Sequence, residues 1–285
     1  MNKSTTFSDQ DVRAYYDQTE VHYRMFWKLE EGLGLHYGVW ESGIKKLAEA
    51  IQNTNRALAH LGNWQQDFRV LDAGCGVGGS AQFLAKNFDC QVHGITLSEK
   101  QVNTAEKFAE KNNLQHLLRF STQSYTKTNF RTDQFDAAWA IESMQTATDK
   151  KAFFQEMQRI IKPGGQLFIG DMFKAFSYSI QDQPRMQKLL HGWAMSDLLD
   201  FPELISMAEE HGFILGNSRK VTEEVRPSVW RIYLAALAGM IGTKWYNLFH
   251  NGAYFGRIHY TTGINQFWTY RQKLWDYQLA VFTKK

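Results

Sequence analysis

A glycine-rich segment with one carboxylate is the strongest chemical signal in this sequence. Residues 70–79 read VLDAGCGVGG, in which one acid, Asp72, precedes four glycines. Glycines let the backbone approach a ligand closely, but they cost stability inside a helix or strand. An apolar run before Asp72 predicts a buried strand and the pattern after residue 79 predicts a helix, so the glycines lie in a strand-to-helix turn. Doubly wound sheets bind nucleotides at such turns.

The spacing of the glycines separates two classes of ligand. Dinucleotide-binding enzymes use G-x-G-x-x-G and place a pyrophosphate at the helix N-terminus. Here Gly74, Gly76 and Gly78 are two residues apart. The carboxylate of Asp72 would repel a pyrophosphate but suits a positively charged ligand, so the motif favours a cationic nucleotide. For Gly78 and Gly79 the alternative is a structural one, tight packing of the helix on the strand.

The composition excludes several classes of protein. The chain has 285 residues, a net charge of +3 and 44% hydrophobic residues, so it can bury a sizeable core. Its two cysteines, Cys75 and Cys90, stand 15 residues apart without a metal-ligand pattern. The sequence has no run of lysines, no apolar N-terminal signal segment and no window of membrane-spanning length. We expect a cytoplasmic protein with no metal, no nucleic-acid partner and no stable membrane insertion.

Apolar runs of strand length alternate with helical patterns through the middle of the chain. One helix is expected after Ser98, a plausible N-cap, and another from about Asp149 to Ile160. This alternation predicts an α/β fold with a seven-stranded, mostly parallel sheet and helices on both faces. The expected strands are 68–74, 90–96, 117–123, 135–142, 162–173, 214–221 and 277–285.

Helical segments are expected before the sheet-forming part of the sequence and again before its last strand. Residues 9–62 read as two or three helices, and we expect residues 1–62 to form a cap over the ligand. Residues 63–221 and 276–285 would form the core, and residues 222–275 a helical lid before the last strand. Together these parts would make a single domain.

The expected lid, residues 222–275, is rich in aromatic and basic side chains. It holds twelve aromatic residues among its 54, and six Lys or Arg against two Glu. Such a segment could wall an apolar pocket, stabilise a cation on aromatic faces and pair with an anionic head such as a diphosphate. The alternative is that the aromatics form the lid core and a subunit interface, with the arginines in solvent. The residues expected to bind an acceptor are Trp230, Arg231, Tyr233, Trp245 and Tyr246, and the further bases that could hold an anion are Arg226, Lys244, Arg257 and Arg271.

Four segments in order resemble the class I methyltransferases that use S-adenosylmethionine (SAM). They are residues 70–79, GITLSEKQ at 94–101, FDAAWAIES at 135–143 and FFQEMQRIIKPGG at 153–165. Within this class the four segments are most similar to those of the sterol, tocopherol and cyclopropane-fatty-acid methyltransferases. Residues 15–40 and the closing YQLAVFTKK also resemble that group. The resemblance covers nearly the whole chain. It implies a Rossmann-like core that binds SAM and releases S-adenosylhomocysteine.

The resemblance also implies which residues would bind the cofactor. Asp72 would engage the methionine or ribose end of SAM. Thr96 and Leu97 would contact the ribose and flank the adenine, and Tyr16 would close over the cofactor. The remaining residues expected at the cofactor are Ala73, Gly74, Cys75, Gly76, Gln101, Ala140 and Ile141.

The sequence departs from these relatives at two points. Gln123 and Ser124, also expected at the cofactor, stand where many relatives place a Gly-Asp pair that binds the adenine amino group. Thr146 stands where relatives often carry a His. Neither His-dependent proton abstraction nor the bicarbonate-assisted route of the cyclopropane synthases therefore carries over to this chain.

Glu142 is the expected catalytic residue. It follows the fourth strand directly and resembles the Glu of the sterol and tocopherol relatives that points into the acceptor cavity. A carboxylate there could accept a proton or steady a cation. The alternative for Glu142 is a helix-capping role. His36 lies in a loop expected near SAM, where a functional and a structural role are both open.

Transfer of a methyl group from SAM chiefly requires a positioned acceptor and the exclusion of water, so few catalytic side chains are expected. The first hypothesis is C-methylation of a lipophilic small molecule, such as an isoprenoid or a prenyl diphosphate. The second is O- or N-methylation of a phenolic, quinol or alkaloid-like metabolite, and the third is a non-catalytic SAM-binding protein. The expected partners are the small-molecule acceptor and, in a homodimer, a second copy of this chain.

Overall fold

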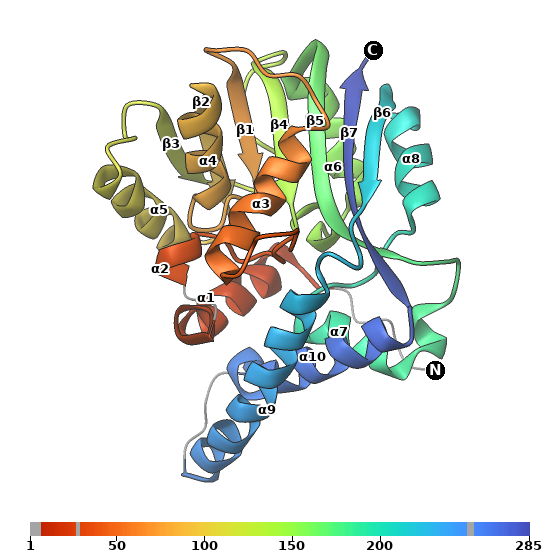
Figure 1. The fold of residues 1–285 in the computed structure, drawn as a ribbon. Helices are drawn as coiled ribbons and strands as arrows, with labels where there is room; N and C mark the ends of the chain where they lie inside the picture. The colour runs from red at the N-terminus through yellow and green to blue at the C-terminus, as the bar shows by residue number, and fades with distance from the viewer. Residues whose placement is uncertain (1–6, 27–28, 250–253) are drawn as a thin grey trace.

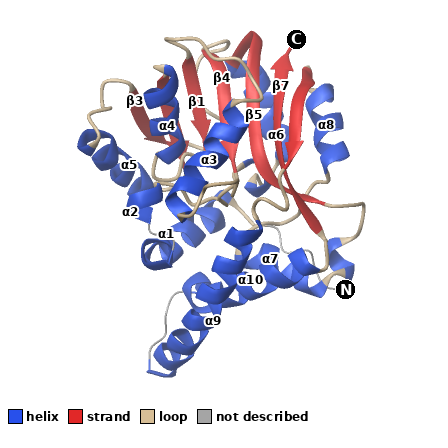
Figure 2. Cartoon of the chain, in the orientation of Figure 1, coloured by secondary structure: helices blue, strands red, loops and turns tan. Residues whose placement is uncertain are grey.

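The computed structural model describes residues 7–26, 29–249 and 254–285, and the side chains of 7–19, 29–240 and 259–285. Within these residues the centre is one seven-stranded sheet in the order β3-β2-β1-β4-β5-β7-β6 (Figures 1 and 2). β7 runs antiparallel to β5 and β6, and the other neighbouring pairs are parallel, which confirms the predicted fold class. The strands are β1 (Arg69–Ala73), β2 (Gln91–Thr96), β3 (Leu118–Thr122), β4 (Phe135–Ile141), β5 (Ile161–Lys174), β6 (Phe213–Lys220) and β7 (Trp275–Lys284).

Helices cover both faces of the sheet, and each face has its own apolar core. Side chains alternate between the faces along a strand, so in β4 Trp139 packs into one core and Ala138 into the other. Both residues are fully buried, as a parallel sheet covered on two sides requires. The covering helices are α3 (Leu47–Ala59), α4 (Gly79–Phe88) and α5 (Glu99–Lys111) on the first face, and α6 (Lys150–Ile160) and α8 (Phe201–Glu210) on the second.

Side-chain caps fix the starts of two helices that the sequence predicts. The hydroxyl of Ser98 accepts the backbone N–H of Gln101 at the start of α5. The carboxylate of Asp149 accepts the N–H of Ala152 at 2.9 Å at the start of α6. Each cap satisfies an N–H group that the first helical turn leaves without a partner.

Further helices lie below the carboxyl ends of the parallel strands in Figure 1. They are α1 (Asp9–Phe26), α2 (Leu29–Gly32), α7 (Pro184–Gly192), α9 (Arg226–Phe249) and α10 (Tyr254–Arg271), and two short 3-10 helices are η1 (Met144–Thr146) and η2 (Ile180–Asp182). α9 and α10 form an antiparallel hairpin that extends away from the sheet. α7, which the sequence analysis did not predict, packs on α10, where Gly192 meets the side chain of Thr262. The domain boundaries expected above remain predictions.

Two glycines of the glycine-rich turn have packing roles. A Cβ at Gly78 would lie 2.8 Å from the ring of Phe120 in β3. A Cβ at Gly79 would lie only 1.9 Å from the carbonyl oxygen of Leu33, in the segment that follows α2. The absence of a side chain at Gly79 therefore lets the N-terminal segment lie directly on the first turn of α4.

We expect Gly79→Ala to destabilise the fold by about 1–3 kcal/mol, because the added methyl group would push two backbone segments apart. Gly216→Ala in β6 is the matched control, since its Cβ would lie 3.4 Å from the nearest atom. Denaturant unfolding of both variants measures the difference. Equal midpoints for Gly79→Ala and the parent chain would show that the segment after α2 does not need this contact.

Candidate functional site

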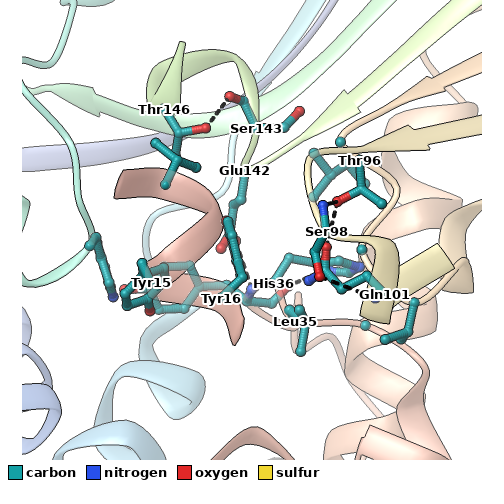
Figure 3. A pocket seen from close by; sticks show the side chains of 18 of the residues that line it. Tyr15, Tyr16, Leu35, His36, Thr96, Ser98, Gln101, Glu142, Ser143 and Thr146 are labelled. Carbon is teal, nitrogen blue, oxygen red and sulfur yellow. Dashed lines mark hydrogen bonds between the residues drawn. The ribbon is translucent and has the colours of Figure 1, made fainter. Parts of the chain in front are cut away.

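A cavity of about 230 Å³ lies at the carboxyl ends of the parallel strands (Figure 3). Its walls come from the glycine-rich turn after β1, the ends of β2, β4 and β5, the segment 33–37, and helices α1, α9 and α10. Segments far apart in the sequence thus meet at the edge where doubly wound sheets bind ligands. Of the residues expected at the cofactor, those that line the cavity are Tyr16, Asp72, Gly74, Cys75, Gly76, Thr96, Leu97, Gln101 and Ile141.

The backbone of the glycine-rich turn forms one wall of this cavity. Gly74 and Gly76 have φ angles of +89° and +52°, which L side chains rarely adopt. A Cβ at Gly74 would also lie 2.4 Å from the Cβ of Ser143. Ala73 does not line the cavity, since its side chain is buried in the core and its carbonyl accepts the Ser143 hydroxyl at 2.6 Å. The cavity therefore borders main-chain atoms here, as the sequence analysis expected of the motif.

Asp72 places a buried carboxyl group in the same wall. Its side chain is 2% exposed, and burial raises its pKa to about 7, against an opposing hydrogen bond from the backbone N–H of Ala81. Its Oδ2 atom has no hydrogen-bond partner among the described residues. A buried oxygen of this kind is costly unless a ligand donates to it. The site thus fits a ligand that carries an N–H, an O–H or a positive charge.

The end of β2 and helix α5 shape the next part of the cavity. Thr96 donates its hydroxyl hydrogen to Oε1 of Gln101 at 2.5 Å, and this bond fixes both side chains. Leu97 packs in one apolar cluster with Tyr16 of α1. Figure 3 shows Tyr16 and Gln101 on opposite sides of the cavity. This arrangement encloses a ligand between α1 and the β2–α5 turn.

Besides Ala73, three residues expected at the cofactor do not line the cavity. Gln123 donates to the Ser121 hydroxyl at 2.9 Å and accepts the N–H of Asn129 at 2.9 Å. The Ser124 hydroxyl bonds to that of Thr126. Ala140 points into the core on the second face of the sheet, because strand alternation directs its neighbour Ile141 the other way. The structure does not bring these three side chains to the site.

Glu142 lies where the end of β4 meets the cavity. Its φ of +48° is unusual for a residue with a side chain, and its N–H is bonded to the carbonyl of Gly170. Its Oε1 accepts the N–H of Tyr37 at 2.7 Å and the hydroxyl of Tyr277 at 2.8 Å. Burial raises its pKa to about 8 despite these two bonds. The carboxyl group caps no helix, since η1 has no side-chain cap, so the capping alternative finds no support.

Two further polar side chains line the cavity outside the expected set. Asp171 in β5 is buried, accepts the N–H groups of Gln145 and Met172, and has its pKa raised by burial to about 7. His36 bonds through Nδ1 to the carbonyl of Tyr37, and burial lowers its pKa to about 4, so it is a neutral imidazole. Asp171 ends an apolar run in the same way as Asp72, and this sequence signal could have identified it.

The α9–α10 hairpin contributes mostly small and aliphatic residues to the cavity, together with the rings of His259 and Tyr260. From α9 they come at helical spacing, so one face of the helix borders the cavity. The hairpin residues on the cavity are Ile232, Ala235, Ala236, Gly239, His259, Tyr260, Thr262 and Gly263. Near the end of β5 the wall continues with Met172, Trp193 and Met195.

Two of the expected acceptor-binding aromatics, Trp230 and Tyr233, lie on another face of α9. Trp230 is 43% exposed, and the centre of its ring lies 4.6 Å from the centre of the Phe267 ring. Tyr233 stacks on Phe267 at 4.2 Å. The guanidinium of Arg231 lies 5.0 Å from the centre of the Trp40 ring. None of these three expected residues lines the cavity, because the helix turns them outward, and they fit the packing alternative. The side chains of Trp245 and Tyr246 lie outside the described part of the structure.

Comparisons with known proteins agree on one domain and one fold. The family described as Methyltransferase domain matches residues 71–169. Sterol 24-C-methyltransferase of Aspergillus fumigatus is 27% identical over 82% of this chain and 62% of its own length, so the chain spans less than two thirds of that relative. (+)-O-Methylkolavelool synthase of Herpetosiphon aurantiacus is 27% identical over 84% of this chain and 87% of its own.

A solved structure shares the fold of the whole chain. Geranyl diphosphate C-methyltransferase from Streptomyces coelicolor, in complex with Mg²⁺, geranyl diphosphate and S-adenosylhomocysteine, superposes with a TM-score of 0.74 over 97% of each chain at 17% identity. The matched domain, residues 71–169, includes Asp72, Thr96 and Glu142. Residues 71–169 therefore match a methyltransferase domain, and the whole chain is similar in sequence to the two relatives above and in fold to a methyltransferase.

Proposed function

We propose that this chain transfers the methyl group of SAM to a lipophilic, isoprenoid-like small molecule. The observation that carries the proposal is the single cavity that joins a glycine-lined wall with Asp72 to an apolar wall from α9 and α10. Glu142 and Asp171 line the same cavity. Two ligands in contact, a cationic nucleoside and an apolar acceptor, would match these two kinds of wall.

The cofactor half of the cavity would hold SAM through this chain's own groups. The partnerless Oδ2 of Asp72 and the main chain of Gly74 and Gly76 would face it, with Thr96 and Leu97 beside the nucleoside. When bound, SAM supplies an electrophilic methyl group on a positively charged sulfur. Tyr16 and Leu97 would exclude water from that half, since both belong to one apolar cluster.

Glu142 is the group that would handle charge or a proton on the acceptor. Its two hydrogen bonds both end on Oε1, which fixes the carboxyl group at the cavity wall. In C-methylation of an alkene, Glu142 would stabilise the positive charge on the acceptor and remove a proton from carbon. In O-methylation it would remove the hydroxyl proton instead.

Two relatives support different acceptor atoms. The sterol 24-C-methyltransferase favours carbon, and the kolavelool relative, named for an O-methyl product and matched over most of both chains, favours the oxygen of a terpenoid alcohol. Radiolabelled SAM offered with sterols, prenyl alcohols, prenyl diphosphates and quinols, followed by mass analysis of the products, tests the proposal. Methylation of none of these, with SAM still bound, would favour a non-catalytic SAM-binding protein.

We expect the SAM affinity of the parent chain to fall about tenfold per pH unit below pH 7 and to level off above about pH 8. A bound cation favours the ionised form of Asp72, whose pKa is about 7 without ligand, so binding at lower pH must release a proton. Asp72→Asn should bind SAM about 10–100-fold more weakly and lose this part of the pH dependence.

Calorimetry of both proteins from pH 5.5 to 8.5 measures this effect. The difference between the two isolates Asp72, because titration of SAM itself and of Glu142 and Asp171 is common to both. An unchanged slope in Asp72→Asn would contradict the role of Asp72.

Glu142→Gln is expected to keep SAM affinity within about threefold and to lower kcat by about 100-fold or more, since it removes the base but keeps the shape. Tyr277→Phe is the control variant, because it removes one hydrogen bond to Oε1 and leaves the carboxyl group. SAM binding by calorimetry and turnover of a panel acceptor separate the two effects. A parallel loss of SAM affinity in Glu142→Gln would refute a role on the acceptor side.

Gly239→Leu is expected to raise the KM for the acceptor at least tenfold while SAM affinity stays unchanged. Gly239 lines the cavity, and a Cβ built on it would meet no described atom within 4 Å, so the added side chain would enter open space. Gly239→Ala, which adds one carbon, should have little effect. If Gly239→Leu leaves acceptor kinetics unchanged, the acceptor does not reach α9.

A further inference from the structure

We infer that the acceptor is an uncharged lipophile and that no diphosphate or other anionic head group is bound in the cavity. This inference rests on the proposed function and names the charge class of its acceptor. The acceptor chamber is the part of the cavity formed by the end of β5, the segment after α7, and the α9–α10 hairpin, with the lining residues Met172, Trp193, Met195, Ile232, Ala235, Ala236, Gly239, His259, Tyr260, Thr262 and Gly263. None of these residues is Asp, Glu, Lys or Arg, and Nε2 of His259 lies 3.4 Å from the hydroxyl of Tyr15.

The charged residues that line the whole cavity are mostly acids. The described lining holds Asp72, Glu142 and Asp171 against one Arg or Lys, Arg13. Arg13 belongs to α1 and lies 3.5 Å from the carboxylate of Asp17, with which it pairs. A prenyl diphosphate would therefore bring several negative charges to a cavity that already contains three buried carboxyl groups, where like charges repel most strongly.

The described arginines that the sequence analysis expected to hold an anion do not point into the cavity. Arg231 lies over the ring of Trp40, and Arg226 pairs with Glu223 at 3.7 Å. Arg271 is exposed and does not line the cavity. The other two expected bases, Lys244 and Arg257, have side chains outside the described part of the structure. No described Lys or Arg of the hairpin thus reaches the chamber to bind a diphosphate.

A metal ion could in principle carry an anionic head in place of a base, as Mg²⁺ accompanies geranyl diphosphate in the Streptomyces coelicolor structure. Among the described side chains, no group of three or more His, Cys, Asp or Glu is arranged to hold a metal ion. Glu142 is already fixed by two donors on Oε1, and Asp171 accepts two backbone N–H groups. Hydrogen-bond donors of the protein therefore hold these carboxyl groups, and the groups are not arranged to coordinate a metal ion.

Three ligands that share one carbon skeleton and differ in the charge of the head group test this inference. We would titrate farnesol, farnesylamine and farnesyl diphosphate into the protein saturated with S-adenosylhomocysteine, at pH 7.5 and low salt, with and without Mg²⁺. Quenching of tryptophan fluorescence reports binding, since Trp193 lines the chamber. Farnesol and farnesylamine are expected to bind at least tenfold more tightly than farnesyl diphosphate. Tighter binding of the diphosphate, with or without Mg²⁺, would overturn the inference.

Asp171→Asn tests whether the cavity acids set this preference. Removing one carboxylate should lower the ratio of the Kd of farnesyl diphosphate to the Kd of farnesylamine at least threefold. Asp182→Asn, at an exposed carboxylate outside the cavity, should leave the ratio unchanged. An equal ratio in the parent chain and in Asp171→Asn would overturn the electrostatic argument.

The same titrations distinguish this inference from the proposed function. If S-adenosylhomocysteine binds and none of the three probes does, the chamber is not a site for an uncharged lipophile, while the cofactor half stands. If S-adenosylhomocysteine itself does not bind, the proposed function fails, and the inference fails with it.

Discussion

Burial of carboxyl groups at the carboxyl edge of the sheet is the constraint on which the site depends. Asp72 and Asp171 lie near the carboxyl ends of β1 and β5, and Glu142 directly follows β4, so the sheet brings the three to one cavity. Desolvation raises the pKa of all three, to about 7, 8 and 7 respectively. Such a cavity favours a cationic ligand over an anionic one, because a positive charge offsets the cost of ionising these groups. The sulfonium of SAM has the required charge.

The N-terminal segment after α2 completes the cavity and orders its catalytic side. Its Tyr37 donates to Glu142, and its Gly38 exchanges hydrogen bonds with the hydroxyl of Ser228 at 3.0 and 3.1 Å. The segment also lies against Gly79 at the start of α4. One short stretch therefore contacts the glycine-rich turn, the expected catalytic carboxylate and α9. The position of this segment is therefore fixed by the cofactor half and by α9 at once.

The sequence predicted the sheet more fully than the site. Near-continuous apolar runs identify strands because burial on both faces of the sheet needs them, and a cap such as Ser98 marks a helix start locally. The cavity wall at Gly74 and Asp72 was predictable because its function lies in backbone geometry and charge, both encoded within ten residues. Helix α7 was missed, since its role arises from its contact with the distant α10, whereas the apolar run before Asp171 was a local signal that was not used. Gln123 was expected at the cofactor from its position in a motif, yet its own hydrogen bonds hold it elsewhere.

The hairpin shows why composition alone misplaced the acceptor wall. Aromatic residues are concentrated in α9 and α10, but a helix presents different residues on each face, and the large rings of Trp230 and Tyr233 pack around Phe267 on an outer face. A Cβ at Gly263 would lie 2.7 Å from the Cβ of Ala236, so the two helices approach closely where they border the cavity. Close approach of two helices requires small residues, and small residues leave room for an acceptor. Trp230 and Tyr233 thus pack on Phe267 away from the cavity, while α9 presents Ala235, Ala236 and Gly239 to it.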